Sequence, residues 1–216
     1  MKMKIGDGRI KIEMPLAGRR RALLVIDVQP ATLSADAAFQ TLERIRAYIR
    51  NANYDAYVIA SFHAPDGSMF ERQLQWTLSK DAAGPVDPVI AAIIAATGKP
   101  WFALDKTVRS VFKAEKDDPL RDFLTAHEID ELHMTGFDIN DCVLASAYDG
   151  LDRGYFSFVI EECSGRTDAD RLVTDAALTV LRKQAMTNNS TRFASIAVEI
   201  SLGQMGGHSS QATLGL

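Results

Sequence analysis

The chain has 216 residues, of which 47% are hydrophobic and 24% charged, a composition typical of one globular domain with a single large core. The net charge of -4 and the pI of about 5.6 give no reason to expect nucleic acid as a partner. No apolar run approaches the roughly 18 residues of a membrane span, and the N-terminal residues alternate charged and apolar types, unlike a signal peptide. Two cysteines make no disulfide framework, so we expect a cytoplasmic protein with no membrane partner, in which each cysteine serves packing or chemistry.

Residues 1–14 are predicted to form a hairpin that precedes the main domain. Its arms, MKMKI and RIKIE, alternate in polarity around a turn at Gly6-Asp7-Gly8. We expect a single domain over 1–216, with its core at 20–200 and a tail at 201–216 that is rich in Gly, Ser and Gln.

From residue 22 onward, short apolar runs alternate with helical patterns. The first run, ALLVIDV at 22–28, is continuously apolar, as expected for a strand buried on both faces. The helix predicted at 37–50 places Phe39, Leu42, Ile45 and Ile49 on one stripe. Further strands are predicted at 57–62, 101–104, 131–135, 155–160 and 194–199, and further helices at 86–97, 119–127, 142–153 and 168–184.

This alternation predicts an α/β fold, namely a doubly wound six-stranded parallel sheet with helices on both faces. In such sheets ligands bind beyond the carboxyl ends of the strands, near the switch in strand order. The segment 63–85 is predicted to be a long loop, and a loop of that length inside a compact domain is usually functional.

Three polar residues lie at the predicted carboxyl ends of strands. Asp27 interrupts the first strand, Lys106 follows the third, and Cys142 follows the fourth. A buried carboxylate is unfavourable unless it is paired. Each residue alone has a structural explanation, as a capping Asp, a surface Lys or a packed Cys. Their shared edge of the sheet makes a functional site the better joint explanation.

Cys142 is predicted to lie in the first turn of a helix that Asn140 or Asp141 can cap. The free N–H groups and the dipole of that turn favour an anion, so we expect the pKa of the thiol to be depressed and the thiolate to act as nucleophile. Cys163, which follows the fifth strand, is interpreted as a packing residue.

The chain resembles the isochorismatase-like cysteine hydrolase superfamily, which includes nicotinamidases and N-carbamoylsarcosine amidohydrolases. The resemblance covers about residues 20–185 and consists of three motifs in order. These are Asp-x-Gln at 27–29, Lys-x-x-x-Ser-x-Phe at 106–112, and Gly-x-x-x-x-x-Cys-Val at 136–143. It implies a strand order of 3-2-1-4-5-6 and a homodimer or homotetramer, for which the hairpin and the tail are candidate contacts.

The resemblance also implies catalytic roles for the three polar residues. Asp27 would take the thiol proton, Cys142 would attack a small-molecule substrate to give a thioester, and Lys106 would stabilise negative charge. A cis peptide bond is implied at Phe137–Asp138, with the backbone N–H groups of Asp138 and Cys142 forming an oxyanion hole.

Departures from the family pattern bear on cofactors and substrate. The nicotinamidase branch places metal ligands at Asp-x-His after the second strand, where this chain has Ser61-Phe62-His63. We therefore expect no metal and no other cofactor, and interpret His63 as a packed or capping residue. The presence of Cys142 argues against the isochorismatase reaction, in which the family uses no nucleophilic cysteine. The small or hydroxylated residues that the family often has before the cysteine are replaced by Asp138 and Ile139.

Five residues are candidates for the substrate pocket: Gln29, Trp76, Arg109, Phe112 and Phe137. The aromatic side chains among them equally suit a core, and Arg109 suits either a substrate carboxylate or a solvated surface.

The most favoured function is an amidase-type hydrolase that cleaves a small carbon–nitrogen bond. Two alternatives remain. One is a thiol redox or sensing protein that uses Cys142 and Cys163, although they do not form a Cys-x-x-Cys motif. The other is a catalytically silent scaffold on the same fold.

Overall fold

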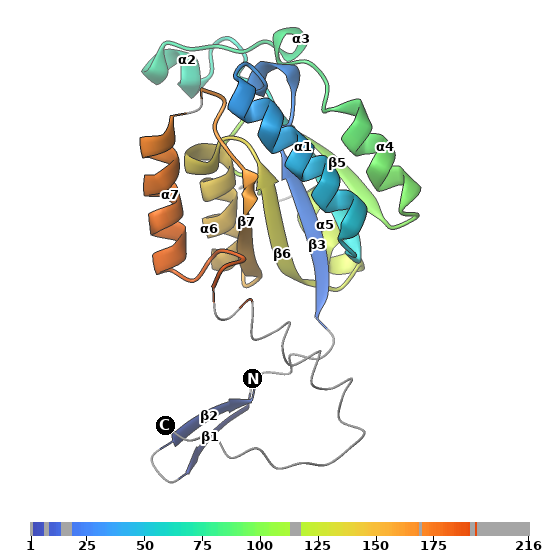
Figure 1. The fold of residues 1–216 in the computed structure, drawn as a ribbon, viewed down its shortest axis with the longest axis vertical. Helices are drawn as coiled ribbons and strands as arrows, with labels where there is room; N and C mark the ends of the chain where they lie inside the picture. The colour runs from blue at the N-terminus through green and yellow to red at the C-terminus, as the bar shows by residue number, and fades with distance from the viewer. Residues whose placement is uncertain are drawn as a thin grey trace.

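The computed structural model describes residues 2–6, 9–13, 19–112, 118–168, 170–190 and 193. Its centre is a parallel sheet in the order β5-β4-β3-β6-β7 (Figure 1). This order corresponds to 3-2-1-4-5 along the predicted strands, so the described sheet has five strands, and the sixth predicted strand, at 194–199, lies outside the described residues. The strands are β3 (Arg20–Ile26), β4 (Ala56–Phe62), β5 (Trp101–Lys106), β6 (Ile129–Gly136) and β7 (Phe156–Ser164).

A separate two-stranded antiparallel sheet precedes the domain. It pairs β1 (Lys2–Gly6) with β2 (Arg9–Glu13), in a register that runs from Lys2 opposite Glu13 to Gly6 opposite Arg9. The middle of the predicted turn, at residues 7 and 8, and the predicted tail at 201–216 lie outside the described residues.

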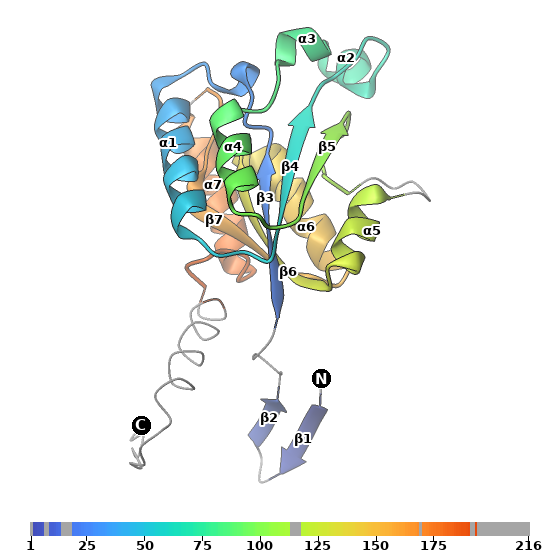
Figure 2. The same ribbon diagram turned by 90° about the vertical axis from the view of Figure 1, so that its right-hand side faces the viewer.

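Helices cover both faces of the sheet (Figure 2). Two lie on one face and three on the other, because right-handed crossovers first add β4 and β5 on one side of β3 and then add β6 and β7 on its other side. The first pair is α1 (Asp36–Asn51) and α4 (Pro88–Ala96); the others are α5 (Pro119–Ala126), α6 (Leu144–Asp152) and α7 (Arg171–Lys183). No helix in the described part of the chain is long and apolar enough to cross a membrane.

The central strand β3 is buried on both faces, as its continuous apolar run predicts. Leu23 and Val25 pack into the cluster under α1 and α4, while Leu24 and Ile26 pack into the cluster under α5, α6 and α7. Successive side chains of a strand point to opposite faces, so one short run anchors both layers.

The predicted stripe of α1 is correct except at Phe39. The buried positions are Ala38, Thr41, Leu42, Ile45 and Ile49, whereas Phe39 is 51% exposed. Residue 39 lies roughly a quarter turn from the centre of that stripe, so the turn geometry directs it to solvent.

The segment 63–85 is partly helical, which corrects the prediction of a long loop. It contains α2 (Met69–Leu74) and α3 (Lys80–Ala83), whose N-caps Ser68 and Ser79 each accept a backbone hydrogen bond. Helices this short contain too few turns to give a periodic apolar pattern. Both lie at the end of the sheet toward which β3, β4 and β5 point (Figure 2).

Gly136 allows the ends of β3 and β6 to approach each other closely. Its φ is 120°, and a Cβ at this position would lie 1.9 Å from the carbonyl oxygen of Ile26. The glycine therefore brings the carboxyl ends of these two strands together at the switch in strand order.

Candidate active site

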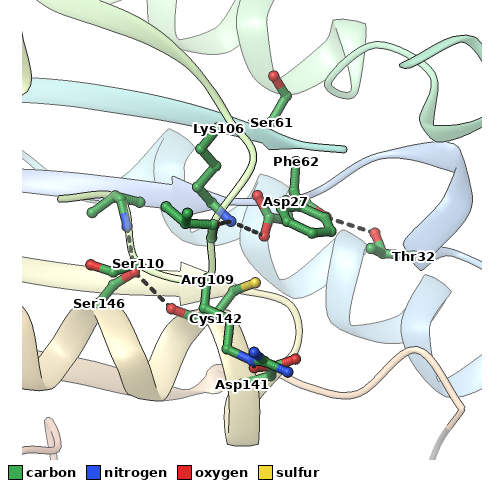
Figure 3. Close-up of polar contacts among 12 residues, drawn as sticks. Asp27, Thr32, Ser61, Phe62, Lys106, Arg109, Ser110, Asp141, Cys142 and Ser146 are labelled. Carbon is green, nitrogen blue, oxygen red and sulfur yellow. Dashed lines mark hydrogen bonds and ion pairs between the residues drawn. The ribbon is translucent and has the colours of Figure 1, made fainter. Parts of the chain in front are cut away.

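A buried ion pair joins the carboxyl ends of β3 and β5 (Figure 3). The Nζ of Lys106 lies 2.7 Å from the Oδ2 of Asp27, and their side chains are 0% and 3% exposed. Lys106 is the last residue of β5, two residues beyond the predicted strand end, so the strand itself aims the ammonium group.

The backbone of Asp27 turns sharply where β3 ends. Its φ is 54°, in the left-handed region that non-glycine residues seldom adopt. The turn is fixed by the Asp27 N–H, which donates to Ala60, and by the Thr32 hydroxyl, which donates to the Asp27 carbonyl at 2.7 Å. Such strain is retained where the side chain must point in a particular direction.

Cys142 lines the same cavity as Asp27. Asp27 follows β3, whereas Cys142 lies in the turn after β6, the next strand of the sheet. Cys142 lies in η2 (Ile139–Val143), a single π-helical turn that leads into α6, and it is 7% exposed. The second carboxylate oxygen of Asp27, Oδ1, is buried and has no partner at ordinary hydrogen-bond geometry among the described residues, although the Cys142 thiol is close enough to affect the pKa of Asp27. The site thus holds a thiol donor beside a carboxylate oxygen that Lys106 does not bind.

The electrostatics of Cys142 correct the sequence-based expectation of a depressed pKa. Burial and the adjacent charge of Asp27 raise the pKa of the thiol well above its ordinary value, more than Lys106 lowers it. Burial also raises the pKa of Asp27, against the opposing effect of Lys106. The resting cysteine is therefore a neutral thiol.

The predicted caps of this turn are also incorrect. Asp138 is the N-cap residue and makes no side-chain capping bond. Asp141 instead pairs with Arg109, and the Asn140 amide oxygen accepts from Arg166. Because the first turn is π-helical, Cys142 occupies its fourth position, one that a regular helix start does not predict.

A cavity of about 310 Å³ opens in front of the thiol and the carboxylate. That volume suits a small molecule. Three of the five predicted pocket residues, Gln29, Trp76 and Phe137, line it. The full lining is Asp27, Gln29, Ala31, Thr32, Phe62, Phe70, Trp76, Leu78, Phe137, Asp138, Asp141, Cys142 and Thr167.

Two predicted pocket residues do not line this cavity. Phe112 is 3% exposed and stacks on Tyr155, beside a different cavity. Arg109 is held by Asp141, with its guanidinium 4.8 Å from the centre of the Phe70 ring. The motif position of Phe112 therefore serves packing, and Arg109 is already neutralised.

Gln29 lines the cavity but binds protein backbone with both ends of its amide. Its Oε1 accepts from the Phe62 N–H at 2.7 Å, and its Nε2 donates to the Gly84 carbonyl at 2.8 Å. Gln29 therefore ties the end of β4 to the segment that carries α2 and α3.

Several lining residues went unpredicted. Phe62 ends β4 and Thr167 follows β7, so the rule that ligands bind at carboxyl ends could have found both. Phe70 lies on α2, and no sequence pattern indicates it. Ser146 was also missed: its hydroxyl donates to the Cys142 carbonyl at 2.7 Å and accepts from the Val111 N–H at 3.1 Å, which holds the turn of Cys142 against the motif that follows Lys106 (Figure 3).

The peptide bond between Phe137 and Asp138 is cis, which confirms the prediction made from the resemblance. No backbone hydrogen bond within the described residues uses the Asp138 N–H, whereas the next N–H, of Ile139, donates to Gly165.

His63 lies beside an acidic residue rather than in a cluster of ligands. Its Nδ1 is 3.1 Å from Asp105, whose other oxygen contacts the Lys80 ammonium at 2.5 Å. Within the part of the chain that the structure describes, no three His, Cys, Asp or Glu side chains are grouped to hold a metal ion.

The two cysteines are free and buried on opposite sides of the sheet. Cys142 belongs to the cluster under α5, α6 and α7, and Cys163 to the cluster under α1 and α4. Since a disulfide needs its two Cβ atoms about 4 Å apart, this placement argues against a redox pair.

The profile of the Isochorismatase domain family matches residues 21–192. The chain belongs to the isochorismatase family. The resemblance seen in the three motifs is thereby confirmed, and the fold is shared with solved members of known and unknown specificity.

Three solved structures illustrate the shared fold. A pyrazinamidase/nicotinamidase from Streptococcus mutans superposes with a TM-score of 0.62 at 20% identity, over 76% of this chain and 96% of that one. An N-carbamoylsarcosine amidase from Thermoplasma acidophilum gives 0.61 at 21%, over 80% and 97%. An isochorismatase-like hydrolase from Alkaliphilus metalliredigens gives 0.62 at 16%, over 78% and 93%.

Proposed function

We propose that this member of the isochorismatase family hydrolyses a carbon–nitrogen bond of the amide or ureide type in a small molecule. Cys142 is the nucleophile, Asp27 the base and Lys106 the charge stabiliser. The observation on which the proposal chiefly rests is that Lys106 binds only Oδ2 of the buried Asp27 carboxylate, while the Cys142 thiol lies at the same cavity and interacts with that carboxylate.

The first half of the reaction forms an acyl-enzyme. Asp27 takes the proton from the Cys142 sulfur, and the sulfur attacks the substrate carbonyl carbon while the carbonyl electron pair moves to oxygen. The N–H groups of Asp138 and Cys142 stabilise that oxyanion. When the carbonyl re-forms, the carbon–nitrogen bond breaks, the nitrogen takes the proton from Asp27, and ammonia or an amine leaves.

The second half hydrolyses the thioester. Asp27 removes a proton from a water molecule that attacks the same carbon, and the tetrahedral intermediate expels sulfur, which recovers its proton. The products are a carboxylic acid, or a carbamic acid from a ureide, and the original thiol.

Lys106 explains how a thiol with a raised pKa can act as nucleophile. Proton transfer from Cys142 to Asp27 moves one negative charge from carboxylate to sulfur, so the three groups together keep the same net charge. The ammonium group, 2.7 Å from Asp27 and coupled electrostatically to Cys142, stabilises the charge in both positions. A neutral resting thiol is thus compatible with catalysis, because the base is prepositioned.

The choice of a carbon–nitrogen bond is supported by the solved relatives that are named as nicotinamidase and N-carbamoylsarcosine amidase. The cavity of about 310 Å³ limits the substrate to a similar small size.

The proposal is tested by measuring ammonia and acid release from a panel of small amides, ureides and carbamoyl amino acids. Wild type is expected to turn over at least one class, and Cys142→Ala to lose at least about a thousandfold in kcat. Cys163→Ala, which removes the cysteine on the other face of the sheet, should retain activity. Equal rates for wild type and Cys142→Ala would refute the mechanism, as would a wild type that hydrolyses nothing and whose Cys142 resists alkylation even at high pH.

A further inference from the structure

The charges around the active-site cavity are unbalanced. The described residues that line it include three aspartates, Asp27, Asp138 and Asp141, and no lysine or arginine. Asp27 is paired with Lys106 and Asp141 with Arg109, both from outside the lining. Asp138 forms no ion pair with any described residue.

Asp138 lines the cavity and is held there by neutral donors. Its Oδ1 accepts from the Thr167 N–H at 2.7 Å and from the Thr167 hydroxyl at 2.9 Å. Arg166, whose charge acts on Asp138, makes its own ion pair with Asp168 at 2.5 Å and also donates to Asn140. Burial raises the pKa of Asp138 more than Thr167 and Arg166 lower it, so a positive charge bound in the cavity would stabilise the carboxylate form.

The opposite wall is aromatic and already supports cations. Phe62, Phe70 and Trp76 contact one another, with Phe62 and Trp76 stacked at 6.1 Å between centroids. The Lys106 ammonium lies 4.7 Å from the centre of the Phe62 ring, and Arg109 lies over Phe70. Trp76 has no such cation among the described residues and is 44% exposed, and indole is the strongest aromatic partner for a cation.

We propose that Asp138 and the wall of Phe62, Phe70 and Trp76 form a subsite for a positively charged nitrogen carried by the acyl part of the substrate. The inference rests on the proposed function and narrows it to amides or ureides that bear an ammonium or amidinium group. Substrates with a carboxylate at that position are excluded, because the cavity lining offers them aspartates and no free cation.

The subsite can be tested by binding, independently of turnover. Trp101→Phe leaves Trp76 as the single tryptophan, since the chain has two. Its fluorescence would be titrated near neutral pH and at low salt with benzylammonium, benzyl alcohol and benzoate. We expect benzylammonium to bind at least about tenfold more tightly than benzyl alcohol, and benzoate to bind most weakly.

Two variants in that background locate the effect. Asp138→Asn keeps an acceptor for Thr167 and should abolish the preference for benzylammonium. Asp152→Asn removes an exposed acid at the end of α6 that lies outside the cavity lining, and it should retain the preference. A benzoate affinity equal to that of benzylammonium, or an unchanged preference in Asp138→Asn, would overturn the proposal.

Turnover then separates the subsite from the reaction. Benzamides with a para aminomethyl, hydroxymethyl or carboxylate group would be compared by kcat and KM, and the aminomethyl compound should have the lowest KM. Binding of the cation without hydrolysis of any amide would support the subsite and contradict the proposed function. Hydrolysis without preference for the cation would support the proposed function and contradict the subsite.

Discussion

The two carboxylate oxygens of Asp27 have different surroundings. Oδ2 is bound by Lys106, which opposes the rise in pKa that burial causes, and Oδ1 has no partner at ordinary hydrogen-bond geometry among the described residues. A carboxylate with both oxygens satisfied would be a poor base, and one without Lys106 would favour its protonated form on burial. The same carboxylate also raises the pKa of Cys142, so one interaction affects both the proposed base and the proposed nucleophile.

Replacement of Asp27 by Asn should therefore make Cys142 easier to alkylate while it lowers catalytic turnover. Without the negative charge of Asp27, and with Lys106 unpaired beside it, the pKa of Cys142 should fall. Alkylation by iodoacetamide should then have its midpoint at a lower pH than in wild type, where it should lie above the free-thiol value of about 8.5. Turnover should nevertheless fall at least about a hundredfold, since the base is lost.

The measurement belongs in a Cys163→Ala background, so that only Cys142 is followed. An alkylation midpoint that stays in place or rises in Asp27→Asn would mean that Asp27 does not control the thiol.

The strand ends position the three proposed catalytic residues. Asp27 follows β3 directly, Lys106 is the last residue of β5, and η2 begins three residues after β6. The pairing of these strand ends requires a glycine at position 136, because Ile26 and Gly136 are partners in the β3–β6 ladder at the point where β6 ends.

Gly136→Ala should destabilise the fold severely. Its Cβ would meet the Ile26 carbonyl oxygen at 1.9 Å, so β3 and β6 must separate, and we expect a loss of at least about 4 kcal/mol in the free energy of unfolding or a failure to fold. Gly154→Ala is the matched control, with a φ of 92° and no atom within 4 Å of an added Cβ. It should lose only about 1–2 kcal/mol from backbone strain. Urea unfolding curves compare the two, and equal losses would contradict the steric argument.

Sequence patterns predicted the elements where burial dominates and failed where local geometry decides. The apolar run at β3 and the order of motifs located Asp27, Lys106 and Cys142. The π-helical turn at Cys142 was not predicted, because no propensity distinguishes it from an α-helical start. Phe112 was predicted to line the substrate pocket but lies beside a different cavity. A sequence motif gives the position of a residue along the chain, but not the direction in which its side chain packs.

A second buried polar network, away from the cavity, involves the amino-terminal half of β6. The Tyr54 hydroxyl lies 2.6 Å from His133 Nδ1, and His133 Nε2 lies 2.7 Å from Glu131. Since a carboxylate only accepts, Nε2 carries the proton and Nδ1 accepts from Tyr54 when the ring is neutral. The active site and this network thus share strand β6 but use opposite parts of it.

The network should make the stability of the fold depend on pH in a defined direction. Burial lowers the pKa of His133 more than Glu131 raises it. Burial raises the pKa of Glu131, but hydrogen bonds and charges from His133 and Arg19 outweigh it and lower the pKa overall. Both folded-state values are depressed, so both groups contribute stability that is complete above about pH 6.5, the ordinary histidine value, and that is lost as the pH falls.

The free energy of unfolding of wild type should therefore decrease from about pH 7.5 to about pH 5, the range in which an unfolded histidine gains its proton. His133→Gln should be less stable at the upper pH, because it disrupts a buried network, yet its stability should change less across that range. The difference between the two proteins isolates His133 from Asp27, whose raised pKa acts with the opposite sign and is common to both proteins. Urea unfolding at a series of pH values provides the comparison. If the two proteins lost stability in parallel, the histidine would not be the group that titrates, and the buried network would be a packing feature alone.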